Sequence, residues 1–180
     1  MSEIITIPIH ILDKSNAQNP AKMPDLVGSG EIDGERFRVS IWTRWTQEQS
    51  RMYHSLAIAP PFDKEAAVQP EAYQRGLKLY EIRRATEADC QYQSPESFML
   101  FGRRLWACFW TEPQADEAAG VVFRLEFRSV PFNQKPSKEA AELMADLRSR
   151  ALDLEQERKL RAMKAEAEAE PDDIPNDWPA

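Results

Sequence analysis

The chain has 180 residues, of which 42% are hydrophobic and 29% are charged, and its formal net charge is −7. This length suits one ordinary domain or two small halves that share a core. No window approaches the roughly 18 apolar residues that a membrane-spanning helix needs, the N-terminus lacks the features of a signal peptide, and two cysteines cannot build a disulfide framework. A cytoplasmic protein that does not enter a membrane is the simplest interpretation.

The negative charge is concentrated at the C-terminal end. From Pro136 onward the sequence holds 12 acidic and 7 basic residues, whereas the first 135 residues hold 18 acidic and 16 basic residues. The body of the protein is therefore nearly neutral. A protein that grips duplex DNA usually carries a strongly basic face, so this composition argues against that class.

The first third of the chain reads as four β-strands. Apolar and polar residues alternate with the period of two that a strand with two different faces requires. Pro8 lacks an amide donor and predicts an edge or irregular position, while Gly28 and Gly30 predict a bulge or a sharp bend. The expected strands are residues 5–12, 26–32, 34–45 and 51–59, with a polar loop at residues 13–24.

The third of these strands recurs later in the sequence. Asp33 and Gly34 predict a tight hairpin turn, because this pair tolerates positive φ angles. The run from Gly34 to Thr43 then aligns without a gap with the run from Gly102 to Thr111. The alignment matches tryptophan with tryptophan and threonine with threonine at the end of each run. We interpret it as an internal duplication.

The second copy predicts a similar series of strands. In this alignment Pro95 and Glu96 correspond to Pro24 and Asp25. Each copy could curl into a barrel of its own, or the two could complete one barrel-like sandwich as a pseudo-dimer. A unit of about 55 residues buries little apolar surface by itself, so a shared core is physically favoured. The second set of strands is expected at residues 78–82, 97–101, 102–111 and 121–130, with an acidic turn at residues 112–120.

A long helix is expected after the second copy. Ser137 is a suitable N-cap and Glu139 suits the first turn. An apolar stripe follows at spacings of three and four residues. This stripe could pack on the sheet or on a second copy of the chain, which would make the protein a homo-oligomer. The stripe consists of Ala140, Met144, Leu147, Ala151 and Leu154.

The sequence thus predicts a mainly β protein, built from an internally duplicated antiparallel unit and ending in an α-helix. The last residues are rich in proline and aspartate and have few apolar side chains to bury, which predicts disorder. The expected parts are a first β repeat at residues 1–61, a linker at 62–76, a second β repeat at 77–135, the helix at 136–168 and a disordered acidic tail at 169–180.

The run from Pro24 to Trp42, followed by the run from Tyr53 to Ile58, resembles a pattern found in small, mostly uncharacterised phage and plasmid proteins. In that pattern Pro-Asp precedes a glycine, a turn of the Asp-Gly or Asn-Gly type and a tryptophan, and an aromatic residue then precedes Ser-Leu. The lysine-rich turn of those proteins is replaced here by residues 46–50. The resemblance implies a phage- or plasmid-type protein, which would act in the host cytoplasm if it is phage-encoded.

The C-terminal tail is similar to the acidic end of bacterial and phage single-stranded-DNA-binding proteins. In that family an oligonucleotide-binding (OB) barrel holds the strand, while the tail docks replication and repair enzymes. The resemblance implies an OB-like barrel here, single-stranded DNA as the ligand, and replication or repair proteins as partners of the tail. The matching tail residues are Asp172, Asp173, Ile174, Pro175 and Trp178.

A candidate binding face follows from the strand alternation. Single-strand binding needs exposed aromatic rings for base stacking and cations along the path of the backbone. The alternative is that the matched tryptophans pack between the copies or under the helix, because tryptophan is usually largely buried. Trp45 falls on the apolar face and is expected in the core. The candidate nucleic-acid-binding residues are Arg38, Trp42, Arg44, Tyr53, Trp106, Trp110, Arg124 and Arg128.

No catalytic constellation stands out in the sequence. His10 and His54 have no cysteine or carboxylate at metal-ligand spacing, and His54 is expected in the core or at its rim. A glycine-rich phosphate loop, a nucleophile elbow and an HExxH helix are all missing from the sequence. We therefore expect no catalytic residues, no cofactor and no metal site.

Two functions remain after this reading. The first is a single-stranded-DNA-binding or accessory DNA-metabolism protein, whose acidic tail recruits partners or competes for the DNA groove. The second is a non-enzymatic protein-interaction factor, such as a phage inhibitor or adaptor, that uses the β body and the C-terminal helix as its interface.

Overall fold

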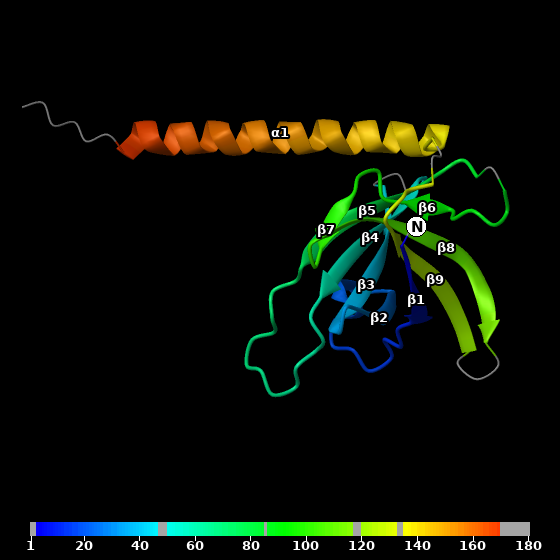
Figure 1. The fold of residues 1–180 in the computed structure, drawn as a ribbon. Helices are drawn as coiled ribbons and strands as arrows, with labels where there is room; N and C mark the ends of the chain where they lie inside the picture. The colour runs from blue at the N-terminus through cyan, green and yellow to red at the C-terminus, as the bar shows by residue number, and fades with distance from the viewer. Residues whose placement is uncertain (1–2, 47–49, 85, 117–119, 133–134, 170–180) are drawn as a thin grey trace, which may run out of the picture. The chain divides into compact units, whose positions relative to one another are not determined.

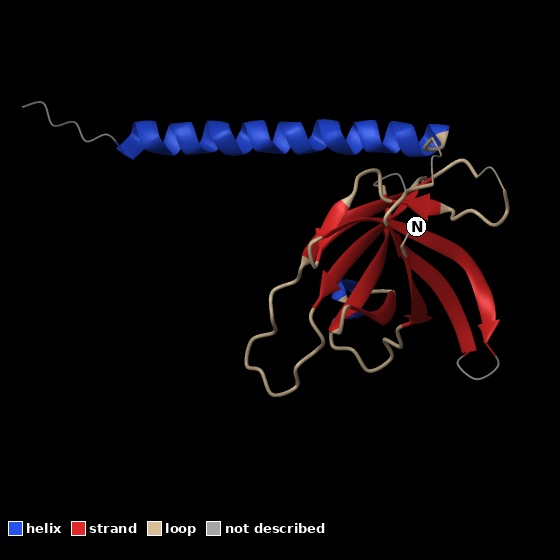
Figure 2. Ribbon diagram, viewed as in Figure 1, coloured by secondary structure: helices blue, strands red, loops and turns tan. Residues whose placement is uncertain are grey.

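A computed structural model describes residues 3–46, 50–84, 86–116, 120–132 and 135–169. The chain divides into two compact units, residues 1–140 and residues 141–180. The first unit is made of strands and the second is helical (Figures 1 and 2). The strands are β1 (Ile4–Ile11), β2 (Leu26–Ile32), β3 (Glu35–Trp45), β4 (Met52–Ala59), β5 (Gln74–Glu81), β6 (Tyr92–Gln93), β7 (Phe98–Leu100), β8 (Arg103–Asp116) and β9 (Gly120–Arg128). The helices are the short 3-10 helix η1 (Pro20–Lys22) and α1 (Lys138–Ala169).

The strands close into an eight-stranded antiparallel barrel. From β1 to β6 each strand pairs with the next one along the chain, β6 pairs with β8, and β9 lies between β8 and β1. The short strand β7 also pairs with β8, beyond the end of β6 on the same edge. The predicted mainly β, antiparallel fold is therefore confirmed. The barrel is OB-like in its closure, and its connections follow a simple meander.

One core fills the barrel and draws equally on both repeats. Phe37, Val39 and Ile41 of β3 point inward and are buried. Their counterparts on β8 are also buried in the same apolar cluster. This answers the question that the sequence left open, because the two repeats complete one barrel instead of two. The β8 residues are Leu105, Ala107 and Phe109.

The two central strands begin with the same kind of turn. Asp33 and Gly34 have φ values of 54° and 84°, and Phe101 and Gly102 have φ values of 47° and 75°. Two successive positive φ angles are typical of the type I′ turn, whose twist suits a β-hairpin. The turn predicted at Asp33 is confirmed, and the second repeat builds the same turn with phenylalanine in the place of aspartate.

The glycines of β2 serve close packing. The pairing of β2 with β3 runs from Leu26 to Ile32 without a register shift, so β2 has no bulge in this pairing, and the alternative of a sharp bend stays a prediction. A Cβ atom at Gly28 would lie 2.5 Å from the backbone oxygen of Pro8, and one at Gly30 would lie 2.6 Å from the ring of Phe37. Contacts this short do not occur between real atoms, so β2 needs glycine where it crosses the core.

Several predicted boundaries in the second repeat are wrong. The expected turn at residues 112–120 is largely strand, because β8 continues to Asp116 with an irregular register after Trp110. The strand β5 begins at Gln74, inside the expected linker at residues 62–76. The strand β6 lies between the strands expected at residues 78–82 and 97–101, where no strand was predicted. Propensity is weak evidence for such short or edge elements, since partners across the sheet decide them.

The helix α1 begins as the sequence predicts. The hydroxyl oxygen of Ser137 accepts a hydrogen bond from the backbone N–H of Ala140 at 3.0 Å, which is the expected N-cap. Two ion pairs, Asp146–Arg150 and Glu155–Lys159, each join residues one helical turn apart and stabilise the surface of the helix. No helix in the described residues is both long enough and apolar enough to cross a membrane. Of the predicted disordered tail at residues 169–180, Ala169 is the last residue of α1, and residues 170–180 lie outside the described part of the chain.

Candidate ligand groove on the outer face of the barrel

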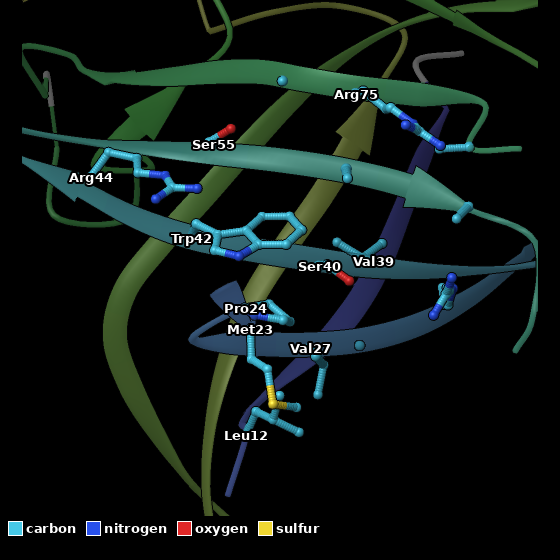
Figure 3. Close-up of a pocket in the computed structure, with 16 residues that line it drawn as sticks. Leu12, Met23, Pro24, Val27, Val39, Ser40, Trp42, Arg44, Ser55 and Arg75 are labelled. Atoms are coloured by element: carbon cyan, nitrogen blue, oxygen red, sulfur yellow. The ribbon is translucent and has the colours of Figure 1, made fainter. Parts of the chain in front are cut away.

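A groove runs across the outer face of β2, β3, β4 and β5 (Figure 3). Its volume is about 650 Å³. Four outward side chains of β3 line it, of which Arg44 faces Tyr53 on β4 and the other three face small residues. Arg38 faces Ala59, Ser40 faces Ala57, and Trp42 faces Ser55. Because alanine and serine do not rise far above the sheet, the surface over β4 stays low.

Three arginines line this groove. Arg38 and Arg44 come from β3 and Arg75 comes from β5. None of the described residues that line the groove is acidic. Within the described part of the chain, none of the three guanidinium groups forms an ion pair. The Nε atom of Arg38 is buried without a hydrogen-bond partner, and its guanidinium carbon lies 5.6 Å from the ring of Phe62. The groove therefore offers positive charge that no described carboxylate pairs with directly, although the nearby carboxylate of Asp25 attracts Arg44.

Trp42 is held in place by the loop between β1 and β2. Its indole N–H donates a hydrogen bond to the carbonyl oxygen of Lys22 at 3.2 Å. Beside it, Asp25 accepts a hydrogen bond from the backbone N–H of Thr43 at 2.7 Å and one from Lys14 at 2.7 Å. Partial burial raises the pKa of the Asp25 carboxyl, but these hydrogen bonds and the charges of Lys14 and Arg44 outweigh it and keep the pKa below its usual value.

The second repeat reproduces the hydrogen bonds that the indole and the backbone make in this arrangement. The indole N–H of Trp110 donates to the carbonyl oxygen of Ala88 at 3.0 Å, and the side-chain oxygen of Gln91 accepts from the backbone N–H of Thr111 at 3.0 Å. The backbone N–H of Gln91 also donates to the carbonyl oxygen of Phe109, as the backbone N–H of Asp25 donates to the carbonyl oxygen of Ile41. The structural counterpart of Asp25 is therefore Gln91, and the predicted match with Glu96 is wrong.

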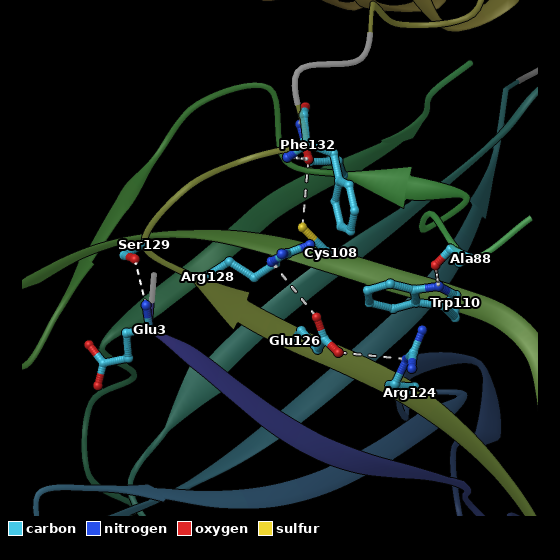
Figure 4. A network of polar contacts seen from close by, with 10 residues as sticks. Glu3, Ala88, Cys108, Trp110, Arg124, Glu126, Arg128, Ser129 and Phe132 are labelled. Carbon is cyan, nitrogen blue, oxygen red and sulfur yellow. Dashed lines mark hydrogen bonds and ion pairs between the residues drawn. The ribbon is translucent and has the colours of Figure 1, made fainter. Parts of the chain in front are cut away.

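Trp110 nevertheless has very different surroundings. Its side chain is 5% exposed, within a small apolar cluster on the outer face of the barrel. The guanidinium carbon of Arg124 lies 3.9 Å from the centre of its ring, and Phe132 packs against the ring edge-on (Figure 4). As it stands, Trp110 cannot serve as the stacking platform that we predicted, since its ring is already covered. The other cluster members are Ile82, Cys90 and Cys108.

The arginines of β9 are engaged within the protein. Glu126 lies between Arg124 and Arg128, with N···O distances of 3.7 Å and 3.9 Å, and its side chain is largely buried. The guanidinium carbon of Arg128 lies 4.0 Å from the centre of the Phe132 ring (Figure 4). These contacts hold the segment after β9 against the barrel. The two arginines are therefore less available to a ligand than the sequence suggested.

The remaining candidates lie apart from the groove. Tyr53 stacks on Tyr80, with 6.1 Å between ring centres. Trp106 is half-buried on β8, where it pairs with Arg128. Trp45, expected in the core, is 57% exposed, because it lies at the end of β3 beyond the barrel interior. Of the eight predicted residues, the structure thus places Arg38, Trp42 and Arg44 in the groove.

Arg75 and Ser55 also line the groove but were not among the predicted site residues. Arg75 lay in the expected linker, and only the bulged pairing of β5 with β4 brings it to the groove. Ser55 was not among the predicted site residues, because what matters is the small size of its side chain opposite Trp42. The register of β3 against β4 follows from the hydrophobic alternation and would have identified Ser55. No comparable signal exists for Arg75.

His54 is a core residue, as expected. It is 3% exposed and packs edge-on against Tyr92 and Phe109, with its Nδ1 atom 3.4 Å from the hydroxyl of Thr43. Burial lowers the pKa of His54 from 6.5 to about 4, and the negative charge of Asp25 opposes this shift only in part. Among the described residues, no group of three or more His, Cys, Asp or Glu side chains could hold a metal ion.

No protein-family model, curated protein or solved structure matches this chain. The resemblances of the first repeat and of the tail therefore stay predictions, and the tail residues from Asp172 to Trp178 lie outside the described part of the chain. A functional assignment has to rest on the residues of the groove.

Proposed function

We propose that the protein binds single-stranded nucleic acid, with single-stranded DNA as the expected ligand, in the groove across β2 to β5. One observation carries this proposal. A half-buried indole, Trp42, lies among three arginines without ion-pair partners in the described chain, over a floor of small side chains.

The chemistry of the groove suits a base and its phosphates. Stacking of a base on an aromatic side chain contributes about 1–3 kcal/mol and tolerates any base. Guanidinium groups donate paired hydrogen bonds to phosphate oxygens. Arg44 lies beside Trp42 and Arg75 lies farther along the groove (Figure 3), and Arg38 lines the groove from the same strand as Trp42. A strand that follows the groove would meet a stacking surface and then two further cations.

Three arginines predict modest and salt-sensitive binding. If each contacts one phosphate, the slope of log K against log salt for a single strand is about −2, from roughly −0.7 per contact. This agrees with the nearly neutral charge of the body, since the first 135 residues contain 16 basic and 18 acidic residues. The protein would then bind single strands without the basic face of a duplex-DNA binder.

The acidic tail supplies the second part of the proposal. Its sequence from Asp172 to Trp178 would recruit replication or repair proteins, as the resemblance implies. A protein with this role would work in the cytoplasm, or in the host cytoplasm if it is phage-encoded. The negative charge of the tail would also compete with nucleic acid for the arginines, so removal of residues 171–180 should tighten the binding of nucleic acid.

The decisive experiment is fluorescence anisotropy with a labelled thymidine oligonucleotide of about ten nucleotides, at low and moderate salt. We expect Trp42→Ala to weaken binding by about 5- to 150-fold, which corresponds to the loss of one stacked base. Trp45→Ala is the matched control, because Trp45 is exposed but does not line the groove. No binding of the wild-type chain at low salt would contradict the proposal.

The alternative is a protein-interaction factor. The helix α1 favours it, because several large apolar side chains on it are exposed to solvent. An exposed apolar surface often marks a protein contact, and a second copy of the chain is the occupant that the predicted homo-oligomer requires. A concentration-independent monomer in analytical ultracentrifugation would remove this support. The exposed residues are Leu152, Leu154, Leu160 and Met163.

A further inference from the structure

The two repeats can be compared position by position on the outer face of the barrel. On one side, Trp42 on β3 and Trp110 on β8 each donate a hydrogen bond to a loop, and the two loops are equivalent. On the other side each tryptophan has a partner directly across the sheet, on the strand that follows. That partner is Ser55 for Trp42 and Arg124 for Trp110.

The difference extends over three successive pairs of outward residues. In the first repeat the partner strand β4 presents Ser55, Ala57 and Ala59 to β3, all of them small. In the second repeat β9 presents long charged side chains to the equivalent positions of β8. The groove is therefore open in the first repeat, whereas side chains cover the same surface in the second. The β9 residues are Arg124, Glu126 and Arg128.

Arg124 shows what this place on the surface can accommodate. Its planar guanidinium lies 3.9 Å from the centre of the Trp110 ring. A planar group at this distance from an indole is favourably placed for stacking and for cation–π attraction. Among the described residues, no ring and no cation stacks in this way on Trp42. The same place over Trp42 is thus left to a ligand.

We infer that Ser55 keeps the base-stacking site of the first repeat open, and that Arg124 fills the equivalent site of the second repeat, so each chain has a single stacking site. The inference rests on the proposed function and specifies it further. One chain takes one stacked base and the phosphates next to it. A longer strand would be covered by several chains.

The test is to make the first repeat resemble the second. Ser55→Arg places a long cation across from Trp42, as Arg124 lies across from Trp110. By charge alone an added arginine should tighten nucleic-acid binding. If the arginine covers the indole, binding of the labelled thymidine oligonucleotide should instead weaken by about 5- to 150-fold, the range that corresponds to one stacked base.

Ser29→Arg is the matched control. Ser29 is an exposed outward residue of β2 that lies beside Arg38 but does not line the groove. It adds the same charge without covering Trp42, so binding should stay equal or become tighter. Ala57→Arg is a second variant of the groove floor in case Ser55→Arg does not fold. Near-ultraviolet circular dichroism checks the fold of each protein.

The outcomes separate this inference from the proposed function. If the wild type binds, Trp42→Ala weakens binding and the folded arginine variants of the floor bind as tightly as Ser29→Arg, the inference is wrong and the proposed function stands. If the wild type does not bind the oligonucleotide at low salt, the proposed function itself fails. Titration of the wild type should also give one equivalent of a tetranucleotide-sized probe per chain, and two equivalents would overturn the single-site inference.

Discussion

Trp42 and Trp110 donate their indole N–H groups to equivalent loop carbonyls, of Lys22 and Ala88, at 3.2 Å and 3.0 Å. Each tryptophan thereby holds a loop against the outside of the barrel. Trp42 holds the loop between β1 and β2, and Trp110 holds the loop between β5 and β6. The two rings then differ in what covers them. Arg124 and Phe132 enclose Trp110, whereas Trp42 faces a groove. One tryptophan is therefore a structural residue, and the other is also available for binding.

This difference predicts unequal effects on stability. Trp110→Ala removes a side chain that is 5% exposed and should lower the free energy of unfolding by about 3–5 kcal/mol. Trp42→Ala removes a half-buried ring and one hydrogen bond and should cost about 1–2 kcal/mol. Urea denaturation followed by circular dichroism measures both. Equal losses would show that the two rings are buried to the same extent.

Gly28 should tolerate no side chain. A Cβ atom there would lie 2.5 Å from the backbone oxygen of Pro8, which cannot move without shifting β1. Gly28→Ala should therefore destabilise the barrel by about 1–3 kcal/mol or more. Gly34→Asn is the comparison, since a Cβ atom at Gly34 meets nothing within 4 Å, and its φ of 84° strains asparagine less than other side chains, so this variant should lose less stability. Thermal unfolding of the two variants would contradict the packing argument if they behaved alike.

His54 should make stability depend on pH. Its pKa is 6.5 when exposed and about 4 in the folded protein, so the unfolded chain binds more protons between these values. The contribution is present in full above about pH 6.5 and is lost as the pH falls toward 4, by about 3 kcal/mol in total.

The variant His54→Gln should flatten this part of the pH profile, because glutamine does not titrate. Urea denaturation at intervals between about pH 7 and about pH 4.5 gives the slope. His10→Gln is the control, since His10 is the other histidine of the sequence and lies on the outer face of β1. An unchanged slope in His54→Gln would show that other groups cause the acid sensitivity.

Arg75 should contribute one phosphate contact. Arg75→Ala should weaken oligonucleotide binding and reduce the magnitude of the slope of log K against log salt by about 0.7. Arg104→Ala is the control, because Arg104 is also an exposed arginine on the barrel but lies in the second repeat, outside the groove. The same loss of slope in both variants would mean that general charge, and not the groove, attracts the strand.

The sequence alone was sufficient for the strand character of the central segments. Alternation placed Phe37 and Phe109 on the buried faces of their strands, and the turn at Gly34 follows from the conformational freedom of glycine after aspartate. The gapless match from Gly34 to Thr43 also brought Trp42 and Trp110 to equivalent positions. These features are local, because they depend on neighbours within the same strand or turn.

Only the tertiary structure decided which tryptophan remains available. That depends on the residue across the sheet, Ser55 or Arg124, and on loops that fold back over the barrel. The same kind of long-range pairing brought Arg75 to the groove and made Gln91 the counterpart of Asp25. The exposure of a side chain on a barrel is set by cross-strand partners that are distant in sequence, so a strand pattern identifies the face of a residue but does not determine what covers it.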